Sequence, residues 1–510
     1  MECLTYYCLT LFHLIKKESE ANIVFDYSMM DNANRIIKEG AEKRISKETF
    51  IKNEINSFID SKAYKDMITG YDYYKGKHDI LKKTRSAIGN DGEIIDIKNL
   101  PNARQIDNQY KKMVKQKYNY ILGKPISINT ENKEYAKALN NVFNNNFHKQ
   151  MKNVCKDSLN GGIGWLHPYY GDNSELKFKK FLPYELIPGW KDAEHTELEY
   201  MIRRYPVIVY DGDKEKEVIK VEYYTLQGID YYEEFNNAFV PCPPYHAAYM
   251  QVNDKDFNWE RMPFIPFKYN EEEIPLICNC KSIQDGINTI LSNFEDNMNE
   301  DMRNTILILV NYDGTNLGEF RKNLATYGAV KVKSIDGVNG DVKALRVEVN
   351  AENYKAILEI FKKALIENCM GYDAKDERMS GTPNQMNIQS MYNDIDLDAA
   401  DMQTEYKASL EQLLWFVNCH LENTGVGNFE NENVEFIFNT DMPMDEGATI
   451  DNIRNSTGIL STETLIANHP WVDNPQKELE KLKKEKQEDI DQYNEAFEGI
   501  TPNDDKKGDE

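Results

Sequence analysis

The segment "DIDLDAADMQTE" places carboxylates at spacings that could bind a metal ion. Asp394, Asp396, Asp398 and Glu405 occupy positions 1, 3, 5 and 12 of an EF-hand calcium loop. Position 6 of such a loop needs glycine for its sharp turn, but Ala399 stands there within a run of good helix formers. The residue at position 6 therefore argues against a calcium loop.

The same carboxylates also fit one face of a helix. Asp394, Asp398, Asp401 and Glu405 fall at i, i+4, i+7 and i+11, so a helix would present them as one acidic stripe. We predict that this stripe faces solvent or the lumen of a channel. A calcium loop, and a metal-dependent hydrolase that uses these four carboxylates as a two-metal cluster, remain the alternatives. We expect no bound metal, no cofactor and no catalytic residue.

A second candidate for chemistry is the stretch "TGYDYYKGKHDIL", which contains a Gly-Lys pair. A phosphate-binding loop needs glycine, four residues and then Gly-Lys-Ser or Gly-Lys-Thr, because its N–H groups surround the phosphates and its hydroxyl holds magnesium. Here five residues separate Gly70 from Gly76, and His78 follows Lys77 in place of the hydroxyl. The sequence instead predicts a tyrosine-rich amphipathic segment that ends in a glycine turn.

The cysteines and histidines form no recognisable catalytic or zinc-binding motif. The eight cysteines include no Cys-x-x-Cys pair, and such a sparse, scattered set is typical of a reducing compartment. Cys278 and Cys280 with Cys419 and His420 lack the spacing of a zinc site. The sequence has neither a Gly-x-Ser-x-Gly elbow nor a His-Glu-x-x-His helix. We therefore predict that the chain is not an enzyme.

The overall charge limits the ways in which the chain could bind nucleic acid. Its 510 residues include 85 acids and 61 bases, a net charge of −24, whereas broad DNA binding relies on Lys and Arg that displace counterions.

The opening residues, "MECLTYYCLTLFHLIKKES", have an apolar run that is too short to cross a bilayer. We interpret residues 1–45 as an extension or anchoring helix, with a secretion signal as the alternative.

The periodicity of the remaining sequence predicts an α+β fold. Residues 47–160 read as helices, the first of them capped near Ser46, and short alternating apolar runs over 164–270 predict an antiparallel β meander. The rest reads in order as a helix at 281–303, a compact α/β insert at 304–350, a helix at 351–371 ended by Gly371, a loop at 373–388, a long helix at 389–423, the strand "VEFIFNT" and charged helices to residue 498.

Seven motifs in this order resemble the portal proteins of tailed double-stranded-DNA bacteriophages, siphophage type. They are "YDYYKGKHDI", "NQYKKMVKQKYNYILGKPISI", "GIGWLHPYYGDNSELKFKKFLPYELIPGW", "PFIPFKYNEEE", "SIQDGINTILSNFEDNMNED", the Ser380-Gly381 loop and "GILSTETLIANHPWVDNPQKELEKLKKE". Tyr73, Tyr74, Gly76 and His78 match the family's early Y-Y-x-G-x-H pattern, which is a structural landmark and not a phosphate cradle.

The resemblance implies an elongated subunit built from the parts that portal proteins share. By order along the chain these would be an N-terminal extension at 1–45, a wing at 46–280, stem helices at 281–303 and 351–371, a clip at 304–350, a tunnel loop at 372–388, a long helix and wing strand at 389–455, a helical crown at 456–498 and a disordered tail at 499–510. Pro383 departs from the family pattern and leaves the start of the helix after the loop open.

The resemblance also implies a function and partners. Portal subunits form a ring, usually of twelve copies, at one capsid vertex through which DNA is packaged and later ejected. The expected partners are double-stranded DNA, the terminase large subunit, head-completion or adaptor proteins, and the major capsid and scaffolding proteins. The expected location is the virion, and the host cytoplasm during assembly, with no membrane involved. Another structural protein of capsid assembly is the alternative.

Two sets of residues are candidate sites under this resemblance. The tunnel loop would meet DNA through Lys375, Arg378, Met379, Ser380 and Gly381. The clip would dock the packaging motor through Asn311, Tyr312, Asp313, Arg321, Lys331 and Lys333. Twelve copies would carry a charge of about −290, which would keep DNA phosphates from adhering to an acid-lined channel. The acidic composition is equally compatible with solubility alone.

Overall fold

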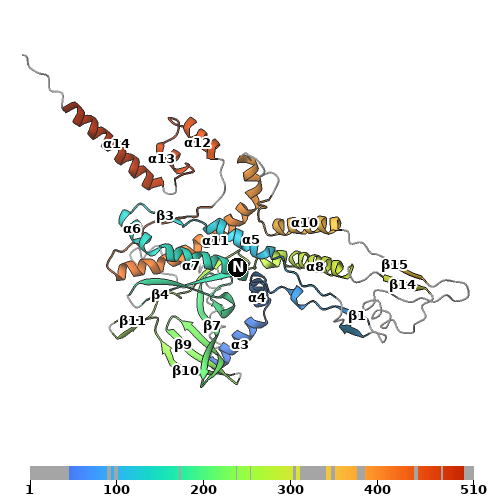
Figure 1. Cartoon of the computed structure of the whole chain (residues 1–510). Coiled ribbons are helices and arrows are strands. Elements are labelled where there is room, and N and C mark those ends of the chain that lie inside the picture. Colours follow the sequence, from blue (N-terminus) through green and yellow to red (C-terminus); the bar gives the residue numbers. More distant parts are fainter. Residues whose placement is uncertain are drawn as a thin grey trace, which may run out of the picture. The chain divides into compact units, whose positions relative to one another are not determined.

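The structure, a computed structural model, shows an α+β chain, as the periodicity predicts (Figure 1). It describes residues 45–88, 93–96, 101–171, 174–236, 238–252, 254–301, 306–310, 341–345, 351–375, 385–440, 446–472 and 475–498. Within these ranges, no helix combines the length and the apolar character that a membrane span requires. The described residues divide into two compact units. The first contains those up to His78, Ile128–Asn279 and Thr404–Ile437; the second contains Asp79–Ser127, Cys280–Gln403 and those from Phe438 onward.

The first unit opens with two short helices, α3 (Lys47–Asp60) and α4 (Lys62–Lys75). Ser46 caps α3 as predicted, since its side chain accepts a hydrogen bond from the Thr49 amide. Ser61 interrupts what the sequence pattern presents as one helix. Its extended backbone ends α3, and its side chain caps α4 by accepting from the Tyr64 amide. A serine within an apolar helical pattern thus marks a helix boundary here.

The Gly-Lys pair builds the end of α4. Gly76 has a left-handed backbone with φ of 85°, and the Gly76 and Lys77 amides donate to the Tyr73 and Asp72 carbonyls in a Schellman arrangement. The His78 ring stacks on the buried Tyr73 ring at 4.4 Å. His78 Nε2 also lies 3.0 Å from the Tyr73 carbonyl oxygen. The motif therefore forms a packed helix terminus.

Two antiparallel sheets, with one short hairpin, occupy the predicted β region of the first unit. The larger is a meander in the order β10-β9-β8-β7-β6, and the smaller has the order β13-β4-β5. The strands are β4 (Ile163–Tyr170), β5 (Leu176–Phe181), β6 (Leu186–Trp190), β7 (Leu198–Asp211), β8 (Lys214–Thr225), β9 (Gly228–Phe235), β10 (Ala238–Ala247), the β11 (Met250–Val252) and β12 (Lys255–Phe257) hairpin, and β13 (Ile265–Lys268). The antiparallel prediction is confirmed, but the strands form separate sheets and not a single meander.

The apolar residues of the meander serve two cores because successive strand residues point to opposite faces. Ile51 and Ile55 of α3 join Ile202 and Val221 in one core. The other core contains Trp165 and Trp190, whose rings stack at 5.8 Å. Burial of these side chains is the main favourable contribution to the stability of this unit.

Helices cover the smaller sheet. They are α7 (Asn145–Gly161) and the second half of α11 (Gln385–Asn423). Helix α6 (Lys133–Val142) instead packs against α11, where the Tyr135 hydroxyl donates to Asn418 at 2.7 Å. The Tyr406 ring packs edge-on against Phe267 of β13, and its hydroxyl lies 2.7 Å from the Ser158 hydroxyl of α7. Beyond α11, β16 (Glu435–Ile437) pairs with β3 (Ser127–Asn129), so the strand predicted at "VEFIFNT" is confirmed.

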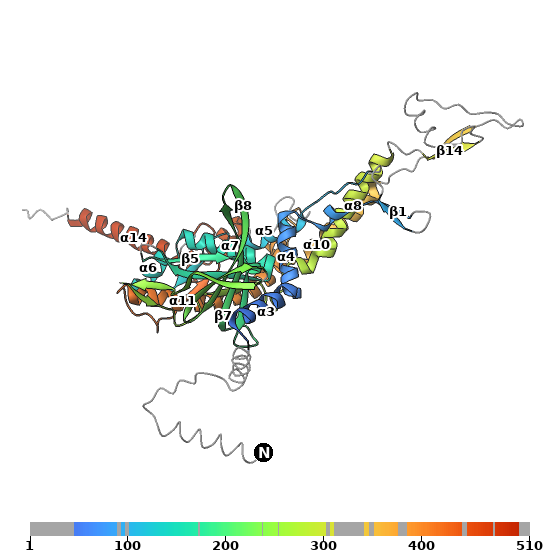
Figure 2. The ribbon, with the colours of Figure 1, turned by 90° about the horizontal axis from the view of Figure 1, so that it is seen from below.

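The second unit contains two long helices, α8 (Ile277–Asp301) and α10 (Ala351–Asn368), which lie side by side in both views (Figures 1 and 2). A Cβ placed on Gly286 would lie 2.5 Å from the Phe361 ring, and the Phe294 and Tyr354 rings are 5.0 Å apart, so the helices run antiparallel. Between them in sequence, β14 (Ile306–Val310) and β15 (Asp341–Leu345) form an antiparallel pair. Both predicted helices are confirmed, although α8 begins earlier and α10 ends earlier than predicted.

The remaining elements of the second unit are short or lie near the C-terminus. They are the 3-10 turn η1 (Asp79–Lys82), the strands β1 (Ser86–Ile88) and β2 (Ile94–Asp96), and the helices α5 (Gln109–Leu122), α12 (Glu446–Asn455), α13 (Thr462–Ala467) and α14 (Pro475–Glu498). Helix α5 ends before Gly123. Helix α12 lies where no helix is predicted.

One face of α8 is polar and yet fully buried. Gln284, Asn288, Ser292 and Asp296 recur every four residues and are at most 1% exposed. Their oxygens accept hydrogen bonds of 2.7–3.1 Å from the amides of residues 110, 107, 105 and 103, respectively. Four helical residues advance about 6 Å, close to the advance of two extended residues, so the chain before α5 can follow the helix axis. These side chains satisfy buried backbone amides that would otherwise be costly.

Candidate functional site

The acidic stripe predicted from sequence lies on α11, which runs without interruption from Gln385 to Asn423. A continuous helix leaves no calcium-loop turn at Ala399. The helix begins four residues earlier than predicted, so residues 385–388 of the expected tunnel loop form its first turn. No group of three or more His, Cys, Asp or Glu side chains in the described ranges is placed to hold a metal ion. The hydrolase alternative therefore has no support.

The prediction that the whole stripe is solvated is wrong for Asp398. Asp394 and Asp401 are exposed, but Asp398 is only 9% exposed and faces into the second unit. Asp398 Oδ2 lies 2.5 Å from Lys117 Nζ of α5, and the Lys117 side chain is 1% exposed. A buried cation needs such a partner, because each charge alone would lose its hydration without compensation.

Lys117 and its neighbour Gln116 also hold the end of α10. Lys117 Nζ donates to the Met370 carbonyl at 3.2 Å. The Gln116 side-chain amide donates to the Tyr372 carbonyl at 2.8 Å and accepts from the Tyr372 amide at 3.1 Å. We call Met370, Gly371 and Tyr372 the root, because they lead into the predicted tunnel loop. Gln116 and Lys117 together are called the α5 clamp.

The left-handed residue at the end of α10 is Met370, with φ of 48°, and not the predicted Gly371. The amides of Met370 and Gly371 donate to the Glu367 and Ile366 carbonyls, which is again a Schellman arrangement. Gly371 is needed for a different reason. A Cβ there would lie 2.8 Å from Gln116 Oε1 and 2.9 Å from Met113 Sδ, so a larger residue would require the ends of these two side chains to move.

Aromatic side chains connect the root to α11. The Tyr372 ring stacks on Tyr392 of α11 at 4.3 Å. Tyr120 of α5 donates its hydroxyl to the Asp396 carboxylate. Burial, and then the Asp396 carboxylate, raise the pKa of Tyr120, so this phenol remains a hydrogen-bond donor at neutral pH.

Most residues of the two predicted sites lie outside the described residues. Of the tunnel-loop set, Lys375 is described; it is exposed, and its amide donates to Asp373 Oδ1 at 3.0 Å. The others lie outside: Arg378, Met379, Ser380 and Gly381 of the loop, and Asn311, Tyr312, Asp313, Arg321, Lys331 and Lys333 of the clip. Of the loop predicted at 372–388, the structure therefore describes residues 372–375 and 385–388.

Sequence reasoning missed the α5 clamp, although a signal was available. Residues 110, 113, 114, 117, 120 and 121 follow helical spacing along the buried face of α5, and all but Lys117 are apolar or aromatic. A lysine in that position implies a buried acidic or carbonyl partner elsewhere in the chain. The sequence alone could not identify the partner, because Asp398 lies 281 residues away.

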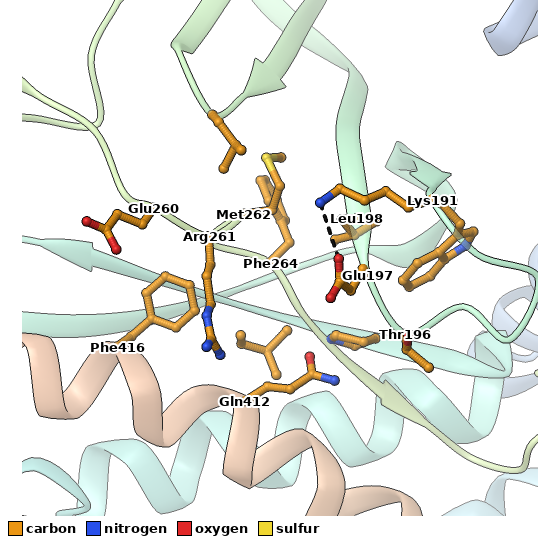
Figure 3. A pocket seen from close by; sticks show the side chains of 14 residues that line it. Lys191, Thr196, Glu197, Leu198, Glu260, Arg261, Met262, Phe264, Gln412 and Phe416 are labelled. Atoms are coloured by element: carbon orange, nitrogen blue, oxygen red, sulfur yellow. Dashed lines mark hydrogen bonds and ion pairs between the residues drawn. The ribbon is translucent and has the colours of Figure 1, made fainter. Parts of the chain in front are cut away.

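A pocket of about 460 Å³ lies in the first unit (Figure 3). It lies between Trp190, the segment around Arg261 and the second half of α11, where Gln412 and Phe416 line it. Lys191 and Glu197 pair across 3.2 Å at its edge. Its lining includes Thr196, Glu197 and Glu260 but no His, Cys or Asp, and the described residues contain no group of three or more such side chains placed to hold a metal ion.

The described cysteines are consistent with the absence of a zinc motif. All six are free thiols: Cys155, Cys242, Cys278, Cys280, Cys369 and Cys419. Burial, followed by the nearby Asp66 carboxylate, raises the pKa of the Cys278 thiol to about 11. A thiol with a raised pKa is a poor nucleophile and a poor metal ligand at neutral pH.

The order of these elements is the one expected of a phage portal protein, and comparison with known proteins agrees. Residues 58–492 match the family described as "Phage portal protein, SPP1 Gp6-like". The portal protein of Bacillus phage SPP1 is 27% identical over 470 residues, which cover 91% of this chain and 90% of that protein. The portal protein of Clostridium phage phiCD119 is 27% identical over 440 residues, covering 83% of this chain and 93% of that protein. The chain therefore belongs to the SPP1 Gp6-like family of phage portal proteins.

Two solved structures show a weaker likeness. A chain in "Neck of native GTA particle computed with C12 symmetry" aligns with a TM-score of 0.37 and 12% identity, over 70% of this chain and 88% of that chain. A chain in "Neck of empty GTA particle computed with C6 symmetry" aligns with a TM-score of 0.38 and 10% identity, over 70% and 87%. Scores this low support no inference about assembly.

Proposed function

We propose that this chain is the subunit of a portal ring at one capsid vertex, through which double-stranded DNA is packaged and later ejected. The observation that carries the proposal is the family match over residues 58–492, together with two portal proteins that align along nearly their whole length. A match of that extent covers both units of the fold and is not confined to one domain.

The ring has twelve subunits under this proposal and acts as a docking platform. Its partners are the terminase large subunit, head-completion or adaptor proteins, and the major capsid and scaffolding proteins. The ring resides in the virion and, during assembly, in the host cytoplasm. The chain carries out no chemistry of its own, in line with the lack of catalytic motifs in its sequence.

The parts of a portal subunit can be assigned to elements of this chain as part of the same proposal. Helices α8 and α10 form the stem, and residues 304–350 between them form the clip that docks the motor. The first unit and the chain before α8 supply most of the wing, and α13 and α14 belong to the crown. Residues 372–384, between the end of α10 and the start of α11, form the tunnel loop that meets DNA.

Electron microscopy of the purified full-length chain tests the proposal directly. We expect a closed ring with a central channel, and a native mass of twelve subunits. A monomer or dimer at micromolar concentration would contradict it.

Deleting residues 304–350 should abolish DNA packaging. Packaging at the wild-type level by that deletion variant would refute the assignment of the clip.

A further inference from the structure

We propose that Gln116 and Lys117, the α5 clamp, are positioning residues that fix the direction in which the chain leaves the root toward residues 373–384. The inference rests on the proposed function in one respect, namely that this segment meets DNA. The positioning itself rests on contacts within the second unit alone.

The first contact resembles the pairing of two strands. The Gln116 side-chain amide donates to the Tyr372 carbonyl at 2.8 Å and accepts from the Tyr372 amide at 3.1 Å. One side chain therefore satisfies both backbone groups of one residue and fixes the orientation of that peptide. Gly371 favours this contact, because a Cβ there would lie 2.8 Å from Gln116 Oε1 and would push that side chain away.

The second contact fixes a backbone conformation that a methionine rarely adopts. Met370 has φ of 48°, a left-handed conformation that is unfavourable for a residue with a Cβ. Its carbonyl accepts from the buried Lys117 ammonium at 3.2 Å. Such a conformation persists only where surrounding contacts enforce it, and strained residues of this kind concentrate at functional sites.

The third contact ties α11 to the same helix. Lys117 pairs with Asp398 at 2.5 Å, and Tyr120 donates to Asp396, so α5 holds the root and also the part of α11 about three turns beyond its first residue, Gln385. The Tyr372 ring also stacks on Tyr392. Helix α5 thus contacts both the root before the segment and α11 after it.

A buried ion pair is a poor choice if stability alone were needed. Well-packed apolar side chains of similar volume commonly stabilise a protein as well as a buried ion pair does, or better. What the pair adds is direction, because Lys117 must point at both Asp398 and the Met370 carbonyl.

Hydrogen exchange on assembled full-length rings, resolved to single amides, tests the clamp without DNA. In Gln116→Leu the Tyr372 amide loses its acceptor and should exchange about tenfold faster. Lys115→Met, which changes an exposed residue of the same helix, should leave that rate unchanged. An unchanged Tyr372 rate in Gln116→Leu would overturn the proposal.

A double variant separates position from stability. Lys117→Met combined with Asp398→Leu removes both charges and leaves neither unpaired. We expect wild-type melting of the rings, several-fold faster exchange at residues 370–372, and particles that retain less DNA. Wild-type DNA retention together with faster exchange would overturn the positioning role. The proposed function fails separately if the wild-type chain forms no ring. In that case hydrogen exchange on the unassembled full-length chain, compared between the wild type and Gln116→Leu, decides the clamp.

Discussion

Lys117 Nζ lies 2.5 Å from Asp398 Oδ2, with 1% and 10% of the two side chains exposed. Asp398→Asn would leave a buried ammonium without its carboxylate. We expect the free energy of unfolding to fall by about 3–5 kcal/mol. Asp394→Asn is the matched control, because Asp394 lies one turn earlier on the same helix and is exposed. It should change stability by no more than about 0.5 kcal/mol.

Urea denaturation of the two variants at one protein concentration measures this difference. The concentration must be held fixed because oligomer assembly contributes to apparent stability. Equal, small losses at both positions would mean that Asp398 is solvated like Asp394 and that the ion pair does not form.

The polar face of α8 gives a second prediction. Asn288 Oδ1 accepts from the Asp107 amide at 3.1 Å, and the Asn288 side chain is fully buried. Asn288→Leu keeps the volume but leaves that amide without this acceptor, which should cost about 1–3 kcal/mol. Thr289→Val, at the adjacent exposed position, should be close to neutral. Thermal unfolding of both variants checks the result. An unchanged melting temperature in Asn288→Leu would show that the chain before α5 does not depend on this hydrogen bond from α8.

Helix and strand patterns alone were sufficient for much of the fold. Apolar residues at helical spacing located α8 and α10, and alternation located the antiparallel strands. What failed were boundaries set by single residues. Ser61 ends one helix and caps the next, and Met370 takes the left-handed conformation that the pattern assigned to Gly371. At Ser61 a capping hydrogen bond that serine favours outweighed the apolar helical pattern, and at Met370 tertiary contacts outweighed the preference of the residue.

The candidate site was harder to predict, since its key residues are polar. A pattern of polar residues on a helix is normally read as a solvated face. Asp398 and the polar face of α8 from Gln284 to Asp296 are instead buried, because their polar atoms have partners from distant segments of the chain. Sequence spacing gives the face of the helix on which such residues lie, but the partner decides whether that face is wet or buried.

His167 should make the first unit sensitive to acid. Burial lowers the pKa of His167 to about 3, against an opposing hydrogen bond between Nδ1 and the Pro263 carbonyl oxygen at 2.5 Å; Lys179 and Arg203 lower it further. In the unfolded chain His167 binds a proton near its ordinary pKa of about 6.5. In the folded chain it binds that proton only near pH 3. The contribution of His167 to stability is therefore complete above pH 6.5 and is lost as the pH falls toward 3.

The His167→Gln variant isolates that contribution. Between pH 6 and 4, the unfolding free energy of the wild type should fall by up to about 1.4 kcal/mol per pH unit more than that of the variant. Measurements at pH 8, above both pKa values, give the cost of the substitution itself. Parallel pH curves for the two proteins would show that His167 is protonated in the folded chain as readily as in the unfolded one.

The turn at Gly76 offers a test of backbone conformation alone. Its φ is 85°, and a Cβ placed there would meet no atom within 4 Å. Gly76→Ala should therefore cost about 1–2 kcal/mol through backbone strain and not through a clash. Gly76→Asn should cost less, because asparagine tolerates the left-handed region. Equal melting temperatures for the alanine variant and the wild type would indicate that the turn rearranges.

The last prediction concerns the proposed contact between the tunnel loop and DNA. Lys375 and Arg378 are the cations of the segment, whereas Asp373, Asp376 and Glu377 limit how strongly it could hold phosphates. Replacing Lys375 and Arg378 with alanine should leave ring assembly intact, since Lys375 is exposed. Packaged DNA should be shorter or less stably retained, and the difference should grow at low salt, where phosphate contacts are least screened. Particles that carry Lys355→Ala, which changes an exposed lysine of α10, provide the matched control. Full-length, stably retained genomes in the double variant at every salt concentration would show that these two side chains do not contact DNA.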